Sequence, residues 1–242
     1  FHVVRFQQMA KNAMEQIYVN GHIPIVVGGT GFYIQALLYD IDFTGTAQDD
    51  TYRAELENLV KEKGAAYLHN MLRKVDPKSA EDIHANNVKR VIRALEYYRQ
   101  TGQKMSEHNE EERRKESPYE FVYFVLNAPR EQLYARIDRR VDQMIEEGLV
   151  DEVKHLKELG CTKEMVSMQG LGYKEILAYL DGECNLDTAV YTIKRDTRHF
   201  AKRQLTWFRR ERQVTWIQKE VYDYDEDRIL KAMLSHLEGR IC

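Results

Sequence analysis

A short apolar run followed at once by glycines constrains the fold of this chain more than any other feature. Residues 23–27 read IPIVV, residues 28–31 read GGTG, and residues 32–40 have the spacing of a helix. A continuous run rich in β-branched residues predicts a strand buried on both faces of a parallel sheet. A strand, a glycine-rich turn and a helix form an α/β unit, in which ligands bind at the carboxyl ends of the strands.

The turn itself has the composition of an anion-binding loop. The glycines Gly28, Gly29 and Gly31 let backbone N–H groups face an anion, and the helix that follows adds its positive end. Thr30 adds a hydroxyl that can donate or accept a hydrogen bond. The alternative is a tight turn without a ligand, because short glycine clusters are common. No G-x-x-x-x-G-K-[ST] phosphate loop occurs in the 242 residues.

The hydrophobic pattern divides the rest of the chain. Residues 6–21 have helical spacing, and residues 51–102 read as successive amphipathic helices that a charged stretch at 106–117 closes. A second strand is predicted at 120–127, and a last edge strand at 214–217, with long helices between them.

The predicted fold is therefore an α/β core with a parallel sheet. This core comprises residues 1–45 and 118–242, and an all-helical domain, residues 46–117, is inserted into it. The net charge of −3 excludes a global attraction to nucleic acid or membrane, so any basic surface must be local. The three cysteines form no C-x-x-C pair, which favours a reducing cytoplasm. No metal-ligand spacing of histidines and no membrane-spanning run is present.

Residues 86–99 form the first of two basic stretches that are candidates for binding nucleic acid. On a helix, Lys89 and Arg93 share one side with Arg90 at its flank, while Val91 lies on the other side. A solvated charged face is the alternative, and the pattern alone favours it.

The second basic stretch is residues 192–212. The aromatic residues Phe200, Trp207 and Phe208 project on the same side as Ile193, and six cations occupy the opposite half. Too few acids lie within one turn to pair with all of them, which favours phosphate binding over a salt-bridged helix. The cations are Arg195, Arg198, Lys202, Arg203, Arg209 and Arg210.

Two further stretches give weaker signals. Residues 168–176, MQGLGYKEI, read as a glycine-punctuated turn that leads into a helix. In the stretch RIDRRVDQMIEEGL, ordinary i,i+4 ion pairs are the favoured interpretation of three arginines beside two aspartates. These residues are Arg136, Arg139, Arg140, Asp138 and Asp142.

In combination, five stretches resemble the tRNA dimethylallyltransferases, and the resemblance extends from Phe6 to Ile217. The stretches are IPIVVGGTGFYIQALL, HANNVKRVIRALE, RVDQMIEEGLVDEV, QGLGYKEI and AKRQLTWFRR. The resemblance implies a P-loop-like core and an inserted helical domain that binds the tRNA anticodon arm. The implied reaction transfers a dimethylallyl group from dimethylallyl diphosphate to N6 of the adenosine 3′-adjacent to the anticodon.

The resemblance also implies roles for particular residues. Thr30 is expected beside the reactive adenine and the diphosphate, with the loop glycines around it. Arg53 is expected to line the substrate channel, and Arg140 to bind the diphosphate. The residues expected to bind tRNA are Lys89, Arg90, Val91, Ile92, Arg93, Gln169, Gly170, Leu171, Gly172, Tyr173, Lys174, Lys202, Arg203, Gln204, Leu205, Thr206, Trp207, Phe208 and Arg209.

The sequence departs from the family pattern at its start. The family opens with G-P-T-x-x-G-K-T, which holds the diphosphate, and with a D-S-M-Q segment that carries the presumed general base. Neither segment is present, and Arg5 stands where the family has an acidic residue. We therefore expect upstream chain to be missing and these residues alone to be inactive. Mg²⁺ is expected mainly on the substrate diphosphate and the missing segment, with no metal ligands here.

Two alternatives to this enzyme remain open. One is a P-loop relative that phosphorylates a small molecule, against which the two basic helices count. The other is a non-catalytic tRNA-binding remnant, which requires the P-loop to be absent from the native protein. A monomer is expected in each case.

Overall fold

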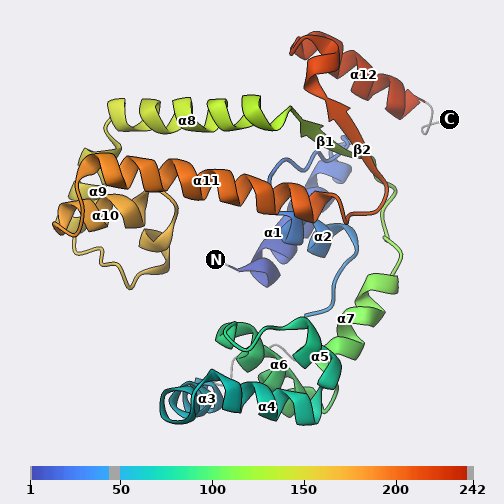
Figure 1. Ribbon diagram of the computed structural model, residues 1–242. Coiled ribbons are helices and arrows are strands. Elements are labelled where there is room, and N and C mark those ends of the chain that lie inside the picture. Colours follow the sequence, from blue (N-terminus) through green and yellow to red (C-terminus); the bar gives the residue numbers. More distant parts are fainter. Residues whose placement is uncertain (1, 44–49, 239–242) are drawn as a thin grey trace. The chain divides into compact units, whose positions relative to one another are not determined.

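The structure is a computed structural model that describes residues 2–43 and 50–238 (Figure 1). The chain divides into two compact units, Phe1–Glu120 and Phe121–Cys242. Helices dominate, and the sheet of the described residues consists of two parallel strands. The predicted α/β core is therefore present only as this small sheet with its helices. The predicted boundary between residues 45 and 46 lies outside the described residues.

The first unit is helical wherever the structure describes regular elements in it. The amphipathic stretches predicted between residues 51 and 102 all form helices, and the charged stretch after them forms one more, α7. In chain order the helices are α1 (Val3–Val19), α2 (Gly31–Leu38), α3 (Asp50–Lys63), α4 (Ala65–Val75), α5 (Pro77–Asp82), α6 (Val88–Thr101) and α7 (Met105–Arg114).

Helices α3 to α6 share one apolar core. Leu56 of α3, Leu68 and Leu72 of α4, and Val91 and Leu95 of α6 are almost completely buried in it. These side chains recur at three- and four-residue intervals within their helices, so each helix presents one apolar stripe to its neighbours. Their burial supplies the main stabilisation of this helical cluster.

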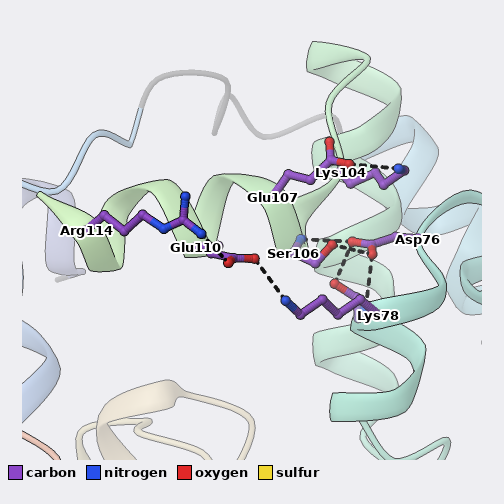
Figure 2. Close-up of polar contacts among 8 residues, drawn as sticks. Asp76, Lys78, Lys104, Ser106, Glu107, Glu110 and Arg114 are labelled. Atoms are coloured by element: carbon purple, nitrogen blue, oxygen red, sulfur yellow. Dashed lines mark hydrogen bonds and ion pairs between the residues drawn. The ribbon is translucent and has the colours of Figure 1, made fainter.

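A buried carboxylate joins two helix starts at the edge of this core (Figure 2). Asp76, the N-cap of α5, is 0% exposed, and each of its oxygens accepts one backbone N–H and one hydroxyl. Ser79 donates from its N at 3.0 Å and from its Oγ at 2.5 Å. Ser106, in the first turn of α7, donates from its N at 2.9 Å and from its Oγ at 2.6 Å. Asp76 therefore accepts hydrogen bonds from backbone N–H groups in the first turns of both helices, which have no partner within their own helix.

These hydrogen bonds determine how Asp76 titrates. Burial by itself would raise the pKa of the Asp76 carboxyl, but the bonds from Ser106 and Ser79 outweigh it. The pKa of this carboxyl is consequently held below its usual value, because all four donors favour the ionised form.

The strand predicted at residues 23–27 is wrong. The segment has no regular structure, and the side chains of Ile23, Ile25, Val26 and Val27 are 76, 84, 43 and 90% exposed. A strand exists only where a neighbouring strand pairs with its backbone, and no strand of the described residues pairs with this segment. The helix predicted after the glycines is confirmed as α2.

The second unit combines the parallel strands with longer helices. Its elements in the described range are β1 (Tyr123–Asn127), α8 (Arg130–Glu146), α9 (Leu149–Glu158), the 3₁₀ turn η1 (Val166–Gln169), α10 (Tyr173–Leu180), α11 (Leu186–Phe208), β2 (Val214–Gln218), the 3₁₀ turn η2 (Lys219–Tyr222) and α12 (Glu226–Glu238). The strands predicted at 120–127 and 214–217 are confirmed as β1 and β2. They pair in parallel, in a register from Tyr123 opposite Val214 to Asn127 opposite Gln218.

The core of the second unit lies between α8, α9, α10 and α11 (Figure 1). Val141, Val153, Ile176 and Ile193 contribute one buried side chain from each of these helices. None of the helices in the described ranges is both long enough and apolar enough to cross a membrane.

Candidate functional site

Thr30 stands at the N-cap position of α2, where the glycine-rich turn meets the helix. Its carbonyl oxygen accepts hydrogen bonds from the backbone N of Tyr33 at 2.9 Å and of Ile34 at 3.2 Å. Its hydroxyl makes no capping bond, and the residue is exposed. A Cβ added at Gly28 would meet nothing within 4 Å, so the turn leaves open space before the helix. The hydroxyl of Thr30 and the amino end of α2 can both bind an anion in this space.

Helix α1 fixes the orientation of α2. Gln7 is buried, and its side-chain amide donates to the carbonyl oxygens of Ala36 at 2.8 Å and Ile41 at 3.0 Å. The rings of Phe6 and Tyr33 lie 4.9 Å apart. These contacts set the direction in which the amino end of α2, and with it Thr30, points.

Arg53 lies on α3 and forms a two-pronged ion pair with Glu96 of α6. Its Nε donates to Oε1 at 2.9 Å and its Nη2 to Oε2 at 2.7 Å. The Glu96 side chain is only 2% exposed, whereas that of Arg53 is 36% exposed. Arg53 therefore neutralises a buried carboxylate, and its predicted place in a substrate channel stays a prediction.

The cations of α6 lie on the surface of the first unit. Lys89 and Arg90 are exposed and Arg93 is half-buried, and none of them makes an ion pair within residues 2–43 and 50–238. Val91 and Ile92, by contrast, are 1% and 3% exposed and pack into the core. The structure thus leaves three side chains of this predicted tRNA-binding stretch free for phosphate and gives the other two a packing role.

The predicted turn at residues 168–176 is confirmed in the second unit. Gly172 has a φ of +99°, a conformation that favours glycine, and its N donates to Glu175 Oε2 at 2.9 Å. The hydroxyl of Tyr173 bonds Glu152, and the ammonium of Lys174 lies 3.2 Å from Glu175 and 3.9 Å from Asp196. Gln169 and Gly170 are exposed and Leu171 is half-buried.

Helix α11 carries the second basic stretch and ends earlier than expected. Asn185 caps its amino end by accepting from Thr188 N at 2.8 Å, and its last residue is Phe208. Arg209 and Arg210 therefore follow the helix. Leu205, Gln204 and Trp207 are half-buried. Burial raises the pKa of the nearby Glu211 carboxyl. Ile193 and Phe208 are buried, but Phe200 is 41% exposed, contrary to its projected side.

The amino half of α11 is neutralised by acids, which the sequence pattern did not reveal. Arg198 donates to both oxygens of Asp138 of α8, at 2.6 and 2.8 Å. Lys194 lies 2.5 Å from Asp142 of the same helix, and Arg195 pairs with its neighbour Asp196. The expectation that too few acids serve these cations is therefore wrong for this half, because α8 supplies acids to Arg198 and Lys194 and Asp196 pairs with Arg195.

The carboxyl end of α11 and the residues after it keep their charge. Lys202, Arg203, Arg209 and Arg210 are exposed and make no ion pair with any residue that the structure describes. Three of them, with His199, Thr206 and Trp207, line an open pocket of about 420 Å³. The guanidinium of Arg203 also lies 5.6 Å from the ring of Phe200. Exposed cations of this kind can bind phosphates.

Arg136, Arg139 and Arg140 lie on α8 and line a second open pocket. The ion pairs expected within that helix are wrong, because Asp138 and Asp142 face α11 instead. Because the sequence pattern favoured ion pairs within the helix, it did not indicate Arg136 and Arg139 as candidate site residues. The apolar residue Val141, which lies between the two aspartates, marks that packed face in the sequence.

Within the described residues no cluster of three His, Cys, Asp or Glu side chains could hold a metal ion.

Comparisons with known proteins agree on one family. The IPP transferase family model matches residues 1–211. A tRNA dimethylallyltransferase of Lachnoclostridium phytofermentans is 59% identical over 237 residues, which are 98% of this chain and 75% of that protein. A solved tRNA isopentenylpyrophosphate transferase of Bacillus halodurans shares 40% identity, with a TM-score of 0.61 over 98% of this chain and 77% of its own. A solved structure of a eukaryotic dimethylallyltransferase acting on tRNA shares 29% sequence identity with this chain. Its TM-score is 0.77, and the match covers 96% of this chain and 60% of that one.

Proposed function

The chain belongs to the IPP transferase family, the tRNA dimethylallyltransferases, and on this premise we propose how its residues act on tRNA. The proposed substrate is the adenosine 3′-adjacent to the anticodon, and the donor is dimethylallyl diphosphate. The observation that carries the proposal is the unpaired basic surface at the carboxyl end of α11, formed by Lys202, Arg203, Arg209 and Arg210.

Residues 46–117 are the proposed tRNA-binding insertion, and residues 1–45 and 118–242 the catalytic core. Lys89, Arg90 and Arg93 support this division, because they are surface cations without an acidic partner among the residues described for the first unit. A helical cluster with its own core can present such a surface rigidly. The protein is proposed to act as a monomer.

The chemistry requires a dry, closely fitted site. N6 of adenine is a poor nucleophile because its lone pair is delocalised into the ring, so the allylic C–O bond must ionise readily. As N6 bonds to C1 of the donor, the diphosphate leaves with the electron pair of that bond, and N6 loses a proton to a base. The adenine must first leave the base stack. The exposed hydroxyl of Thr30 is proposed to hold the amine or a diphosphate oxygen beside the open space at Gly28.

The described residues contain no group of three or more His, Cys, Asp or Glu side chains that could hold a metal ion. The proposal is that Mg²⁺ comes bound to the diphosphate. Residues 1–242 alone are proposed to bind tRNA without transferring the prenyl group, since they contain no G-x-x-x-x-G-K-[ST] phosphate loop.

A salt titration of tRNA binding tests the proposed function. Replacing Lys202 and Arg209 with alanine should weaken binding and flatten the slope of log K against log salt by about one to two, since each phosphate contact contributes about 0.7–0.9. The fold should survive, because exposed charges contribute only about 0–1 kcal/mol.

Lys154 and Lys231 provide a matched control, because both are exposed and make no ion pair among the residues described for the second unit. Changing them to alanine removes the same charge but should leave the salt slope unchanged. An equal loss in both double variants would mean that binding depends on net charge alone, and a constant slope would remove phosphate contacts from α11.

A further inference from the structure

The exposed face of α8 carries arginines that no acidic residue neutralises. Arg136, Arg139 and Arg140 are exposed, and none makes an ion pair within the described part of the chain. Around the helix axis, Asp138 and Asp142 lie about 120–160° from Arg136 and Arg140, and they pair with Arg198 and Lys194 of α11. The packing of α8 against α11 therefore uses both aspartates on the side away from these two arginines.

These arginines share an open pocket of about 590 Å³ with apolar side chains. Leu133, Ile137 and Met144 line it and are half-buried. The one carboxylate in the lining, that of Glu147, accepts a hydrogen bond from Gln143 at 2.7 Å. Guanidinium groups beside apolar side chains suit a compact anion that carries a short hydrocarbon chain.

Helix geometry separates the three arginines. With about 100° per residue, Arg136 lies about 40° from Arg140 around the helix axis, whereas Arg139 lies about 100° from Arg140 and about 60° from Arg136 on its other side. Side chains one turn apart are neighbours and can bind the same ligand. The planar fork of each guanidinium also matches phosphate oxygens, with two parallel hydrogen bonds.

We propose that Arg136 binds the diphosphate of the allylic donor together with Arg140, in the pocket along α8. This inference rests on the proposed function, because the donor and the role of Arg140 come from it. A diphosphate concentrates its charge on two adjacent groups and requires cations that converge. Three of the unpaired cations of α11 also share a pocket, but its lining contains no aliphatic residue for the hydrocarbon part of the donor.

Titration calorimetry with inorganic pyrophosphate tests the inference on the 242-residue chain. Arg136→Ala and Arg140→Ala should each weaken pyrophosphate binding about tenfold, the loss expected for a charge-assisted contact. Arg139→Ala removes the same charge from the same helix and pocket. It should change the affinity by less than about twofold, because Arg139 lies about 100° around the axis from Arg140 and an exposed charge that does not contact the diphosphate is screened. Arg136→Lys should recover only part of the loss, since a lysine lacks the fork.

Reaction with phenylglyoxal gives a readout at the level of single residues. Pyrophosphate should protect Arg136 and Arg140 from modification, and leave Arg139 reactive, when the modified peptides are quantified by mass spectrometry. A residue that only supports the fold would show no such protection.

Several results would overturn the inference. They are equal losses for Arg136→Ala and Arg139→Ala, no protection of Arg136 by millimolar pyrophosphate, or a loss of anticodon stem-loop binding by Arg136→Ala with pyrophosphate binding intact. The last result would assign the pocket to RNA phosphates. If the unsubstituted chain binds the stem-loop but not pyrophosphate, this inference fails and the proposed function stands. If it binds pyrophosphate at Arg136 but no stem-loop, the proposed function fails.

Discussion

Replacing Asp76 with asparagine is the sharpest test of how the helical cluster of the first unit is held together. The substitution keeps the shape of the side chain but leaves one acceptor oxygen in place of two. Each carboxylate oxygen now accepts one backbone N–H and one hydroxyl, from Ser79 and Ser106. A serine hydroxyl can rotate to accept from the new NH₂ group, but a backbone N–H cannot, so one buried donor is left facing another.

The cost can be worked from these contacts. A hydrogen bond to a charged group contributes about 1.5–3 kcal/mol, and an unsatisfied buried donor costs about 1–3 kcal/mol. Because these effects overlap, we expect Asp76→Asn to lower the free energy of unfolding by roughly 3 kcal/mol. The melting temperature of a unit of this size should fall by about 10 °C.

The pH dependence has a defined sign. The folded-state pKa of Asp76 is lowered, so its contribution to stability is fully present above the unfolded pKa of about 3.9. That contribution is lost as the pH falls through the folded pKa. The difference in unfolding free energy between the two proteins should therefore be constant from about pH 5 to pH 7 and shrink below about pH 4.

Thermal unfolding followed by circular dichroism measures the size of the effect, and hydrogen exchange locates it. Amides at the amino ends of α5 and α7 should lose protection in the variant. Asp82→Asn, at the exposed last residue of α5, is the matched control and should melt like the unsubstituted chain. Equal melting temperatures for the two variants, or a difference between Asp76→Asn and the unsubstituted chain that is as large at pH 3 as at pH 6, would refute the reasoning.

Other substitutions test the remaining assignments. In an enzyme extended to the family's full length, Thr30→Ala should lower kcat about 10²-fold with little change in tRNA affinity, if one transition-state hydrogen bond is lost; an unchanged kcat would make Thr30 a turn residue. The 242 residues incubated with tRNA and dimethylallyl diphosphate should give no prenylated adenosine above background, and robust turnover would contradict this. Arg53→Ala should lower the melting temperature by stranding the buried Glu96, at a cost of about 3 kcal/mol, and adding Glu96→Leu should restore it. An unchanged melting temperature for Arg53→Ala would mean that the ion pair with Glu96 does not stabilise the fold.

The elements that local pattern could predict are those whose stabilising partners lie nearby in the chain. The helices of the first unit followed from apolar spacing, because Leu68, Leu72, Val91 and Leu95 meet within one short stretch. Strands β1 and β2 followed from their β-branched and aromatic residues. The apolar segment Ile23–Val27 shows the limit, since its composition specifies two faces to bury but not the strand that must pair with it.

The candidate site shows the same limit in its charges. The basic character of α11 is visible in the sequence, but the neutralisation of Arg198 depends on Asp138, which is 60 positions away. Which cations remain available for phosphate is therefore a property of helix packing, and counting acids within one turn cannot establish it.

The parallel pairing of β1 with β2 also has a consequence for the order of folding. The side chains of Asn127 and Gln218 bond across this pair although they are 91 positions apart. Contacts so distant in sequence form only after a long loop has closed, which slows folding. The helices of the first unit contact near neighbours in the chain and face no such delay. During synthesis the helices of the first unit can pack before β1 has paired with β2. Val125 and Ile217 become buried only when the two strands pair.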